Sequence, residues 1–194
     1  MSKPAIYTVS DIEAPAIVQT IVLGFANDPI TRWCWPAADA YLEAMPKFIM
    51  ASGGEAFTNK SAYTVEDYRG AALWLPPGIE ADEKALEQLT RETVDVGKQA
   101  ELGAAFKQLD DYHPDQPHWY LPLIAVDPHH QGQGIGALLM KHAVQRCDQD
   151  GIEAYLESSN PKNISLYERH GFETVGEIQV GTVPLLTPMV RLPT

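Results

Sequence analysis

The chain has 194 residues, of which 45% are hydrophobic and 21% charged, as in ordinary globular proteins. Its 14 basic and 26 acidic residues give a formal charge of −12, which argues against nucleic acid, whose binders concentrate positive charge. No apolar run approaches the roughly 18 residues of a membrane span, and the N-terminus lacks the features of a signal peptide. We therefore expect a cytoplasmic protein with one domain over residues 1–194 and no membrane partner.

Two cysteines, Cys34 and Cys147, stand without metal-ligand spacing. Reduced, buried thiols are the expectation for such a pair in a cytoplasmic chain. The adjacent His129 and His130 have no cysteine or aspartate cluster at ligand spacing, so we expect no metal site.

Apolar periodicity and turn signals predict the elements in chain order. The first half reads as a strand at 5–9, a helix from an N-cap at Asp11 to about residue 25, a turn and aromatic segment at 27–36, a helix at 41–51, and strands at 62–68 and 71–75. Residues 80–112 are charged and helix-favouring, and too poor in apolar residues for a separate core, so they read as a helical insertion, with Gly97 and Gly103 suggesting two helices or one broken helix.

The second half continues with a strand at Trp119–Val126, a helix whose buried face carries Ile135, Leu138, Leu139 and Ala143, and a short strand near 152–157. Two further strands are expected within residues 173–191. The pattern predicts a mixed sheet with helices on both faces.

The glycine-rich segment at 131–136 links that strand to that helix. A strand that turns through glycines into a helix presents free backbone N–H groups and the positive end of the helix dipole, which together suit a phosphate. Read from Gly132, the segment fits the dinucleotide pattern Gly-x-Gly-x-x-Ala, with Glu153 or Glu157 as the later acidic residue. The chain lacks room and repeats for the usual parallel sheet, and a purely structural turn is the remaining alternative.

Read from Gln131, the segment is Gln-x-x-Gly-x-Gly, and a second motif follows it at Asn160, Tyr167, Gly171 and Phe172. This linked pair resembles the coenzyme A loop and second signature of the GNAT superfamily of N-acetyltransferases. The resemblance is sharp over residues 119–172 and implies a GNAT-type fold, with a mixed, mostly antiparallel sheet. Residues 73–77, 118–121, 126–132 and 156–159 resemble the puromycin N-acetyltransferase-like group in particular.

The resemblance also implies where acetyl-CoA binds. The loop would receive the pyrophosphate on its backbone N–H groups, and the end of the strand at Trp119–Val126 would hold the pantetheine arm and polarise the thioester carbonyl. Asn160 and Asn163 would hydrogen-bond that arm, although capping and turn formation is the plainer role of asparagine. The full set implied is Ile124, Ala125, Val126, Gln131, Gly132, Gln133, Gly134, Ile135, Gly136, Ala137, Asn160 and Asn163.

Pro122 interrupts the strand in front of the loop. Proline is tolerated at bulges and unwelcome in central strands. A bulge here would splay the strand from its neighbour and open a slot for the cofactor; the alternative is that Pro122 ends a shorter strand.

Tyr167 is the catalytic candidate, as a general acid that protonates the departing thiolate, because a phenol with a pKa near 10 is protonated at neutral pH. The general base is less defined, since the strand glutamate of many relatives has no counterpart in Trp119–Val126. Glu157, His118 and a water chain without a dedicated base all stay open.

The resulting prediction is a direct acetyl transfer in a ternary complex to a primary amine, because no cysteine is placed to carry the acetyl group. A small-molecule acceptor is expected. Phe25, Trp33, Trp35 and Trp74 are expected mostly in the core, but residues 25–36 correspond to the acceptor-side wall of the resembled family, which implies that some of these rings line the substrate pocket. A homodimer is left open because dimers are common in the resembled family. The competing prediction is a non-catalytic acyl-CoA-binding or regulatory module.

Overall fold

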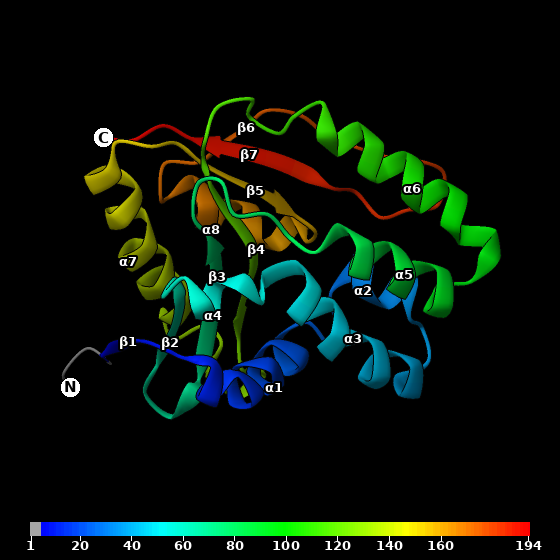
Figure 1. The fold of residues 1–194 in the computed structure, drawn as a ribbon, viewed down its shortest axis with the longest axis horizontal. Coiled ribbons are helices and arrows are strands. Elements are labelled where there is room, and N and C mark those ends of the chain that lie inside the picture. Colours follow the sequence, from blue (N-terminus) through cyan, green and yellow to red (C-terminus); the bar gives the residue numbers. More distant parts are fainter. Residues whose placement is uncertain (1–4) are drawn as a thin grey trace.

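A seven-stranded sheet with the order β1-β2-β3-β4-β5-β7-β6 forms the centre of the protein in a computed structural model that describes residues 5–194 (Figure 1). Every neighbouring pair is antiparallel except β4 and β5, which are parallel. The predicted GNAT-type sheet, mixed and mostly antiparallel, is therefore confirmed. The strands are Ile6–Thr8 (β1), Ala62–Val65 (β2), Gly70–Leu75 (β3), Trp119–Val126 (β4), Ala154–Ser158 (β5), Glu173–Thr174 (β6) and Thr187–Arg191 (β7).

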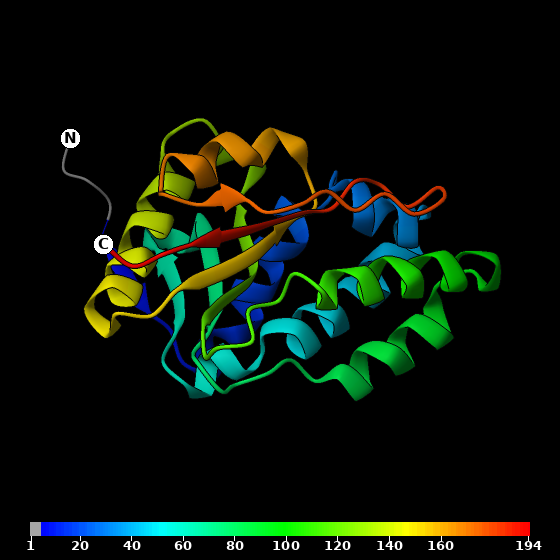
Figure 2. The same ribbon diagram turned by 90° about the horizontal axis from the view of Figure 1, so that it is seen from above.

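Helices cover both faces of this sheet, as predicted (Figures 1 and 2). One core layer joins the sheet to α1, α3, α4 and α5, and the other joins it to α7 and α8. The helices are Ala14–Gly24 (α1), Pro29–Cys34 (α2), Ala38–Gly53 (α3), Glu55–Thr58 (α4), Glu83–Thr93 (α5), Val96–Asp110 (α6), Ile135–Asp150 (α7) and Ile164–Glu168 (α8).

Residues 1–4, on which the expectation about a signal peptide partly rests, lie outside the described part of the chain. Within residues 5–194, no helix has both the length and the apolar character needed to cross a membrane.

Three boundary predictions were wrong, each for a local reason. Helix α2 was read as a turn, but Asp28 accepts from the Thr31 N–H at 3.0 Å and Pro29 occupies the first helical position, so the Asp-Pro pair starts a helix. Ser10, rather than Asp11, caps the first helical turn, through a capping box with Glu13. The strand expected at 62–68 ends at Val65, where a short 3-10 turn begins.

The insertion consists of two helices, and the break between them falls at neither glycine. Asp95 caps α6 by accepting from the Gly97 N–H at 2.9 Å, and Val94 before it is extended. Helix α6 runs beside the long connection between β6 and β7, beyond the edge of the sheet (Figures 1 and 2). Glu101 of α6 holds this connection by accepting from the backbone N–H of Thr182 at 2.7 Å.

A β-bulge at Pro122 shapes the middle of the sheet. Leu73 of β3 pairs with Leu123, whereas Leu75 pairs with Tyr120, so β4 has one extra residue in this interval. The extra residue reverses the alternation of the side chains: Leu121 packs in the core layer of α7, and Leu123 packs in the layer of α1 and α3. Of the two predictions for Pro122, the bulge is confirmed.

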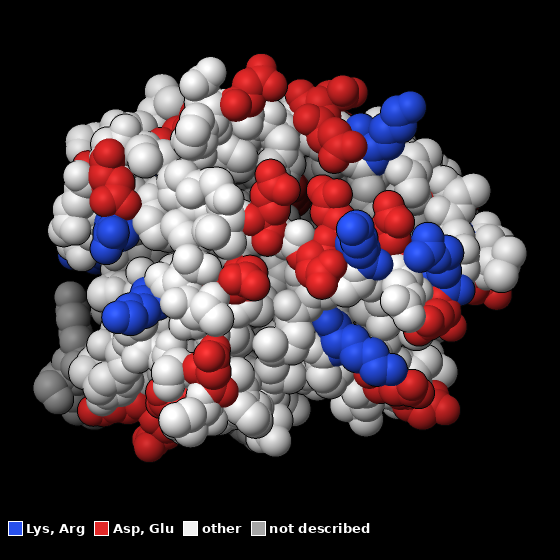
Figure 3. All heavy atoms as spheres, in the orientation of Figure 1, with Lys and Arg blue, Asp and Glu red and all other residues white. Residues whose placement is uncertain are grey.

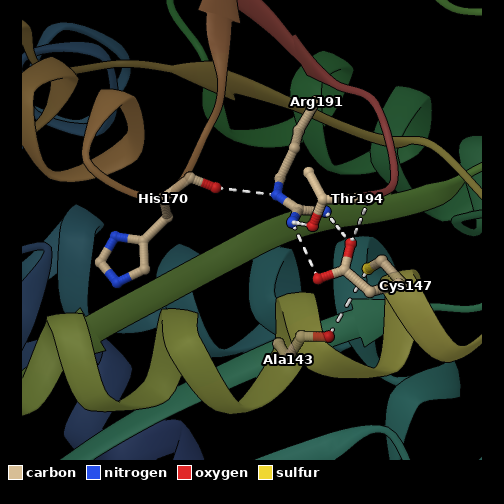
Figure 4. Close-up of polar contacts among 6 residues, drawn as sticks. Ala143, Cys147, His170, Arg191 and Thr194 are labelled. Atoms are coloured by element: carbon tan, nitrogen blue, oxygen red, sulfur yellow. Dashed lines mark hydrogen bonds and ion pairs between the residues drawn. The ribbon is translucent and has the colours of Figure 1, made fainter.

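A buried ion pair ties the last strand to α7 (Figure 4). The guanidinium of Arg191, whose side chain is 6% exposed, contacts both carboxylate oxygens of Asp148 at 2.7 and 2.9 Å and donates through Nε to the His170 carbonyl at 2.8 Å. The backbone N–H of Thr194 donates to the same carboxylate at 3.0 Å. Arg191 thereby joins β7, α7 and the turn after α8 at one point.

Candidate active site

A single cleft of about 1770 Å³ runs between the glycine loop, the second half of β4, the end of β5, α8 and the two helices of the insertion. It brings together segments that are more than 140 residues apart in sequence, such as those of Phe25 and Tyr167. Tyr167, Glu157 and all but one of the predicted cofactor-binding residues line it. The exception is Gln133, whose side-chain amide donates to the His129 carbonyl at 3.3 Å.

The charges along the cleft are unevenly distributed. The basic side chains on the walls nearest the glycine loop are Lys162 and Arg169. Toward the insertion, acidic side chains outnumber the basic Arg91 and Lys107, and Figure 3 shows the acids gathered over the start of α5 and the end of α6, with basic side chains beside them. The acidic residues that line the cleft are Asp28, Glu80, Glu83, Glu87, Asp110, Asp115 and Glu157. The wall near the glycine loop thus suits a polyanion, and the insertion side, where acids are in excess, suits a cation.

The glycine loop forms the polyanion end. Gly132 and Gly134 have φ angles of +74° and +80°, in the left-handed region that favours glycine, and Gly134 is the N-cap of α7. The N–H groups of the first turn of α7 have no partner within the helix, and they point out of its positive end. Gln131 braces the loop by donating to the Val126 carbonyl at 3.2 Å.

Gly134→Ala tests whether this loop holds a phosphate. An alanine in the left-handed region costs about 1–2 kcal/mol, and nothing lies within 4 Å of the added Cβ. We expect the Cβ to push an anion away from the amides and weaken acetyl-CoA binding at least tenfold, about 1.5 kcal/mol for one lost charge-assisted hydrogen bond.

Gly151→Ala is the matched control, since Gly151 at the other end of α7 has a φ of +66° and an equally open Cβ direction. Titration calorimetry with acetyl-CoA should show weakened binding for Gly134→Ala only. Equal affinities in the two variants would mean that the loop does not hold the phosphate.

The splay between β4 and β5 forms the middle of the cleft. The two strands pair only at Trp119 with Ala154 and at Tyr120 with Tyr155, before the bulge. The Asp127 N–H donates to the Arg69 carbonyl beyond β3, and N–H directions alternate along an antiparallel pair. The N–H groups of Ile124 and Val126 therefore point away from β3, into the gap beside β5.

The two asparagines differ in how far the fold already uses them. Asn160 caps the turn before α8, since its side-chain oxygen accepts from the Lys162 N–H at 3.1 Å, so the plainer capping role is present. The side-chain NH₂ group of Asn160 and the whole side-chain amide of Asn163 take part in none of the hydrogen bonds described for residues 5–194. Both residues line the cleft.

Tyr167 lies in α8 with its ring packed edge-on against Phe172 and only 6% of its surface exposed. Burial raises the pKa of its phenol well above the usual value, and the nearby charge of Asp28 adds to the effect. No hydrogen bond to the hydroxyl is described for residues 5–194, and the residue lines the cleft. A protonated donor is therefore available there.

Asp28 is a site residue that the sequence analysis missed. Its carboxylate is buried and accepts from Ser159 Oγ at 2.5 Å, which connects the start of α2 to the end of β5 across 131 residues. Burial raises its pKa, opposed by these hydrogen bonds. The Asn-Asp-Pro triplet was the available signal, but the triplet alone does not reveal that the carboxylate faces a cleft.

Glu157 lies on β5 with 12% of its side chain exposed, and both of its oxygens are engaged. Tyr120 donates its hydroxyl to Oε2 at 2.8 Å, and His113 Nε2 lies 3.2 Å from Oε1. Burial and this carboxylate hold the pKa of Tyr120 well above its usual range. His118, the other candidate base, instead places Nδ1 2.9 Å from the Gln116 carbonyl. His113 was not singled out in the sequence.

Both cysteines are buried, as predicted, and Cys34 lines the cleft. Burial raises the pKa of each thiol to about 12, so neither is a ready nucleophile. Among residues 5–194, no group of three or more His, Cys, Asp or Glu side chains is arranged to hold a metal ion.

Known acetyltransferases resemble this chain both in sequence and in fold. Residues 80–172 match the model of the acetyltransferase (GNAT) family. The whole chain superposes on a crystal structure from Corynebacterium glutamicum, described as histone acetyltransferase HPA2 and related acetyltransferase, with a TM-score of 0.70 and 24% identity, covering 100% of this chain and 98% of the other. The chain has the GNAT fold. The resemblance seen in the sequence is thus confirmed at the level of the fold.

Further relatives and structural neighbours are described as acetyltransferases. An uncharacterized N-acetyltransferase of Schizosaccharomyces pombe is 30% identical over 120 residues, which is 56% of this chain and 49% of that protein. The Drosophila melanogaster polyamine N-acetyltransferase, which forms N-acetylagmatine, superposes with a TM-score of 0.69 at 14% identity over 98% of this chain and all of the other. The chain spans about half the length of the yeast relative. All three of these proteins are described as acetyltransferases.

Proposed function

We propose that this protein is an acetyl-CoA-dependent N-acetyltransferase that moves an acetyl group to a primary amine of a small molecule. The observation that carries this proposal is the cleft that joins the anion-binding loop at Gly134, the slot beside Ile124 and the hydroxyl of Tyr167. The loop would bind the pyrophosphate of one ligand, the slot would hold its pantetheine arm, and the hydroxyl would protonate its leaving thiolate. Acetyl-CoA supplies the activated acetyl thioester.

Backbone and side-chain groups along the cleft would bind successive parts of acetyl-CoA. Free N–H groups of residues 132–137 bind the pyrophosphate, with Lys162 and Arg169 adding positive charge nearby. The N–H groups of Ile124 and Val126 hold the pantetheine arm in the gap beside β5 and polarise the thioester carbonyl. The side-chain amides of Asn160 and Asn163 would donate to the same arm.

Proton movement would fall to two groups, Glu157 on β5 and Tyr167 on α8. Glu157 takes a proton from the acceptor ammonium, which leaves the nitrogen lone pair free to attack the thioester carbon. Tyr167 gives its hydroxyl proton to the sulfur as the carbon–sulfur bond breaks, and the second proton that the nitrogen loses on becoming an amide restores the phenol. Direct transfer in a ternary complex is favoured because the one cysteine on the cleft, Cys34, has its pKa raised to about 12 by burial.

The acid-lined half of the cleft supports a small cationic amine as acceptor. Two structural neighbours fit this class by their own descriptions, namely the Drosophila polyamine N-acetyltransferase, which forms N-acetylagmatine, and arylalkylamine N-acetyltransferase 2 of Aedes aegypti. An antibiotic amine, as in the puromycin N-acetyltransferase-like group, is a more specific variant of the same proposal. The proposal also includes a cytoplasmic location and no nucleic-acid partner. It leaves open whether the protein forms a homodimer.

The competing function is a non-catalytic acyl-CoA-binding module, which the lack of an acid in Trp119–Val126 favours. A dinucleotide-binding protein fits poorly, because a doubly wound fold needs a largely parallel sheet and β4–β5 is the one parallel pair among residues 5–194.

Two measurements separate these functions. Acetyl-CoA at about 100 times its dissociation constant should stabilise the protein by about 2.7 kcal/mol, whereas NAD and NADP should not raise the melting temperature. Free thiol release should then follow on adding agmatine, spermidine or tryptamine. Stabilisation by acetyl-CoA without thiol release from any amine would favour the binding module, and stabilisation by NAD alone would contradict the loop assignment.

A further inference from the structure

The connector between α6 and β4 brings a histidine to Glu157. His113 lies three residues after the end of α6, and its Nε2 is 3.2 Å from Glu157 Oε1. Its side chain is 36% exposed, against 12% for Glu157. The imidazole therefore stands between a sheltered carboxylate and solvent.

The packing around the ring leaves it little freedom to turn. His118 and Tyr120 each lie with ring centroids 5.3 Å from that of His113, and Tyr155 lies at 4.3 Å. The Tyr120 hydroxyl holds the other oxygen of Glu157 at 2.8 Å, so the carboxylate is also fixed. The titratable groups around His113 are Asp110 and Asp115 along its own segment, His118 and Tyr120 from β4 and its lead-in, and Tyr155 and Glu157 from β5.

An N-acetyltransferase must export a proton in every turnover, because a primary amine is an ammonium ion at neutral pH and its amide product is neutral. A sheltered base that takes this proton needs a route for returning it to water before the next cycle. The other sheltered carboxylate of the cleft, Asp28, has the Thr31 N–H and the Ser159 hydroxyl as partners, and neither accepts a proton near neutral pH. Glu157 instead has an imidazole, whose two ring nitrogens can take up a proton on one side and release one on the other.

We propose that His113 is the proton-relay residue of this site and returns the amine's proton from Glu157 to solvent; this rests on the acetyltransferase activity proposed above. The ammonium N–H bond breaks as a Glu157 oxygen takes the proton, and the nitrogen keeps the electron pair. The O–H bond of Glu157 then breaks as Nε2 of the neutral imidazole takes the proton. Nδ1–H then releases a proton to water, which restores the carboxylate and leaves the neutral ring with its proton on Nε2. Proton exchange with solvent at the exposed imidazole returns the ring to its starting tautomer before the next turnover.

The test compares variants of His113 in the full-length protein, with the panel amine that supports the fastest thiol release. His113→Ala should lower kcat/KM for the amine about 100-fold in dilute buffer, the lower end of typical acid–base contributions. Added imidazole should enter the vacated space and restore the rate in proportion to the concentration of its neutral form. KM for acetyl-CoA should not change.

Two further variants sharpen the result. His113→Gln keeps a polar side chain beside Glu157 but cannot take up a proton, so it should lose activity to the same degree without rescue. His142→Gln is the matched control. His142 lies on α7, packs against Tyr63 of β2 and does not line the cleft, so the activity of this variant should equal that of the wild type.

Several outcomes would overturn the proposal. An unchanged rate in His113→Gln would exclude a relay, and a loss in His113→Ala that responds to neither imidazole nor buffer would indicate packing alone. Retention of the acid limb of the pH–rate profile in His113→Ala, with its loss in Asp28→Asn, would place the base at Asp28. A wild-type protein that releases no thiol with any amine would instead refute the proposed function itself, which separates the two failures.

Discussion

Tyr167→Phe should lower kcat about 100-fold or more while leaving KM for acetyl-CoA nearly unchanged, which is the signature of a group that acts in the transition state. The phenol lines the cleft, and burial raises its pKa well above the usual value, so it stays protonated across the accessible pH range. Phenylalanine keeps the edge-on packing against Phe172 and removes only the donor.

Steady-state kinetics of thiol release would measure this effect. Tyr63→Phe is a suitable control, because Tyr63 is similarly buried, packs near α7 and does not line the cleft. The raised pKa also predicts that the wild-type enzyme has no basic limb from Tyr167 below about pH 10. Turnover that is equal in Tyr167→Phe and the wild type would remove the tyrosine from the mechanism.

Arg191→Met should destabilise the fold by about 3 kcal/mol, the lower end of the cost of breaking a buried ion pair by removing one partner. The guanidinium is 6% exposed and holds the Asp148 carboxylate and the His170 carbonyl together (Figure 4). Asp148 is 24% exposed, so water relieves part of the loss. Urea unfolding followed by circular dichroism would measure the change.

The pH dependence of this loss has a definite sign. Arg191 holds the pKa of Asp148 below its usual value of 3.8, so the pair stabilises the folded state above that pH and the contribution fades as Asp148 is protonated at lower pH. The difference between Arg191→Met and the wild type should therefore be complete at pH 7 and shrink below about pH 4.

Arg146→Met is the control for this prediction, since Arg146 pairs with Asp150 at 3.0 Å on the same helix but its side chain is 58% exposed. Its loss should be about 0.5 kcal/mol at neutral pH. Equal destabilisation by the two variants would mean that burial of the Arg191 pair carries no special weight.

The glycine loop and its helix were predictable from the sequence because their determinants are contiguous. The φ angles that require Gly132 and Gly134, the start of α7 at Ile135 and the strand at Trp119–Val126 all depend on residues within a few positions of one another. The same locality explains why Tyr167 and Asn160 could be recognised by their spacing from the loop. Even the bulge at Pro122 had a local cause, a missing N–H in a strand.

Contacts between distant segments were beyond such reasoning. The Ser159–Asp28 hydrogen bond joins residues 131 positions apart, and Glu157 meets His113 from a connector whose own sequence gives no sign of a site. Both depend on the register of β5 and on where the insertion packs, which are set by the whole core.

The sequence by itself determined the class of the fold, the glycine loop before α7 and the candidate that would protonate the leaving group, since periodicity and turn chemistry act over a few residues. Only the tertiary structure decided which acids face the cleft, which histidine touches Glu157 and how Arg191 closes the chain onto α7. Those features arise from sheet register and side-chain burial, which no local pattern encodes.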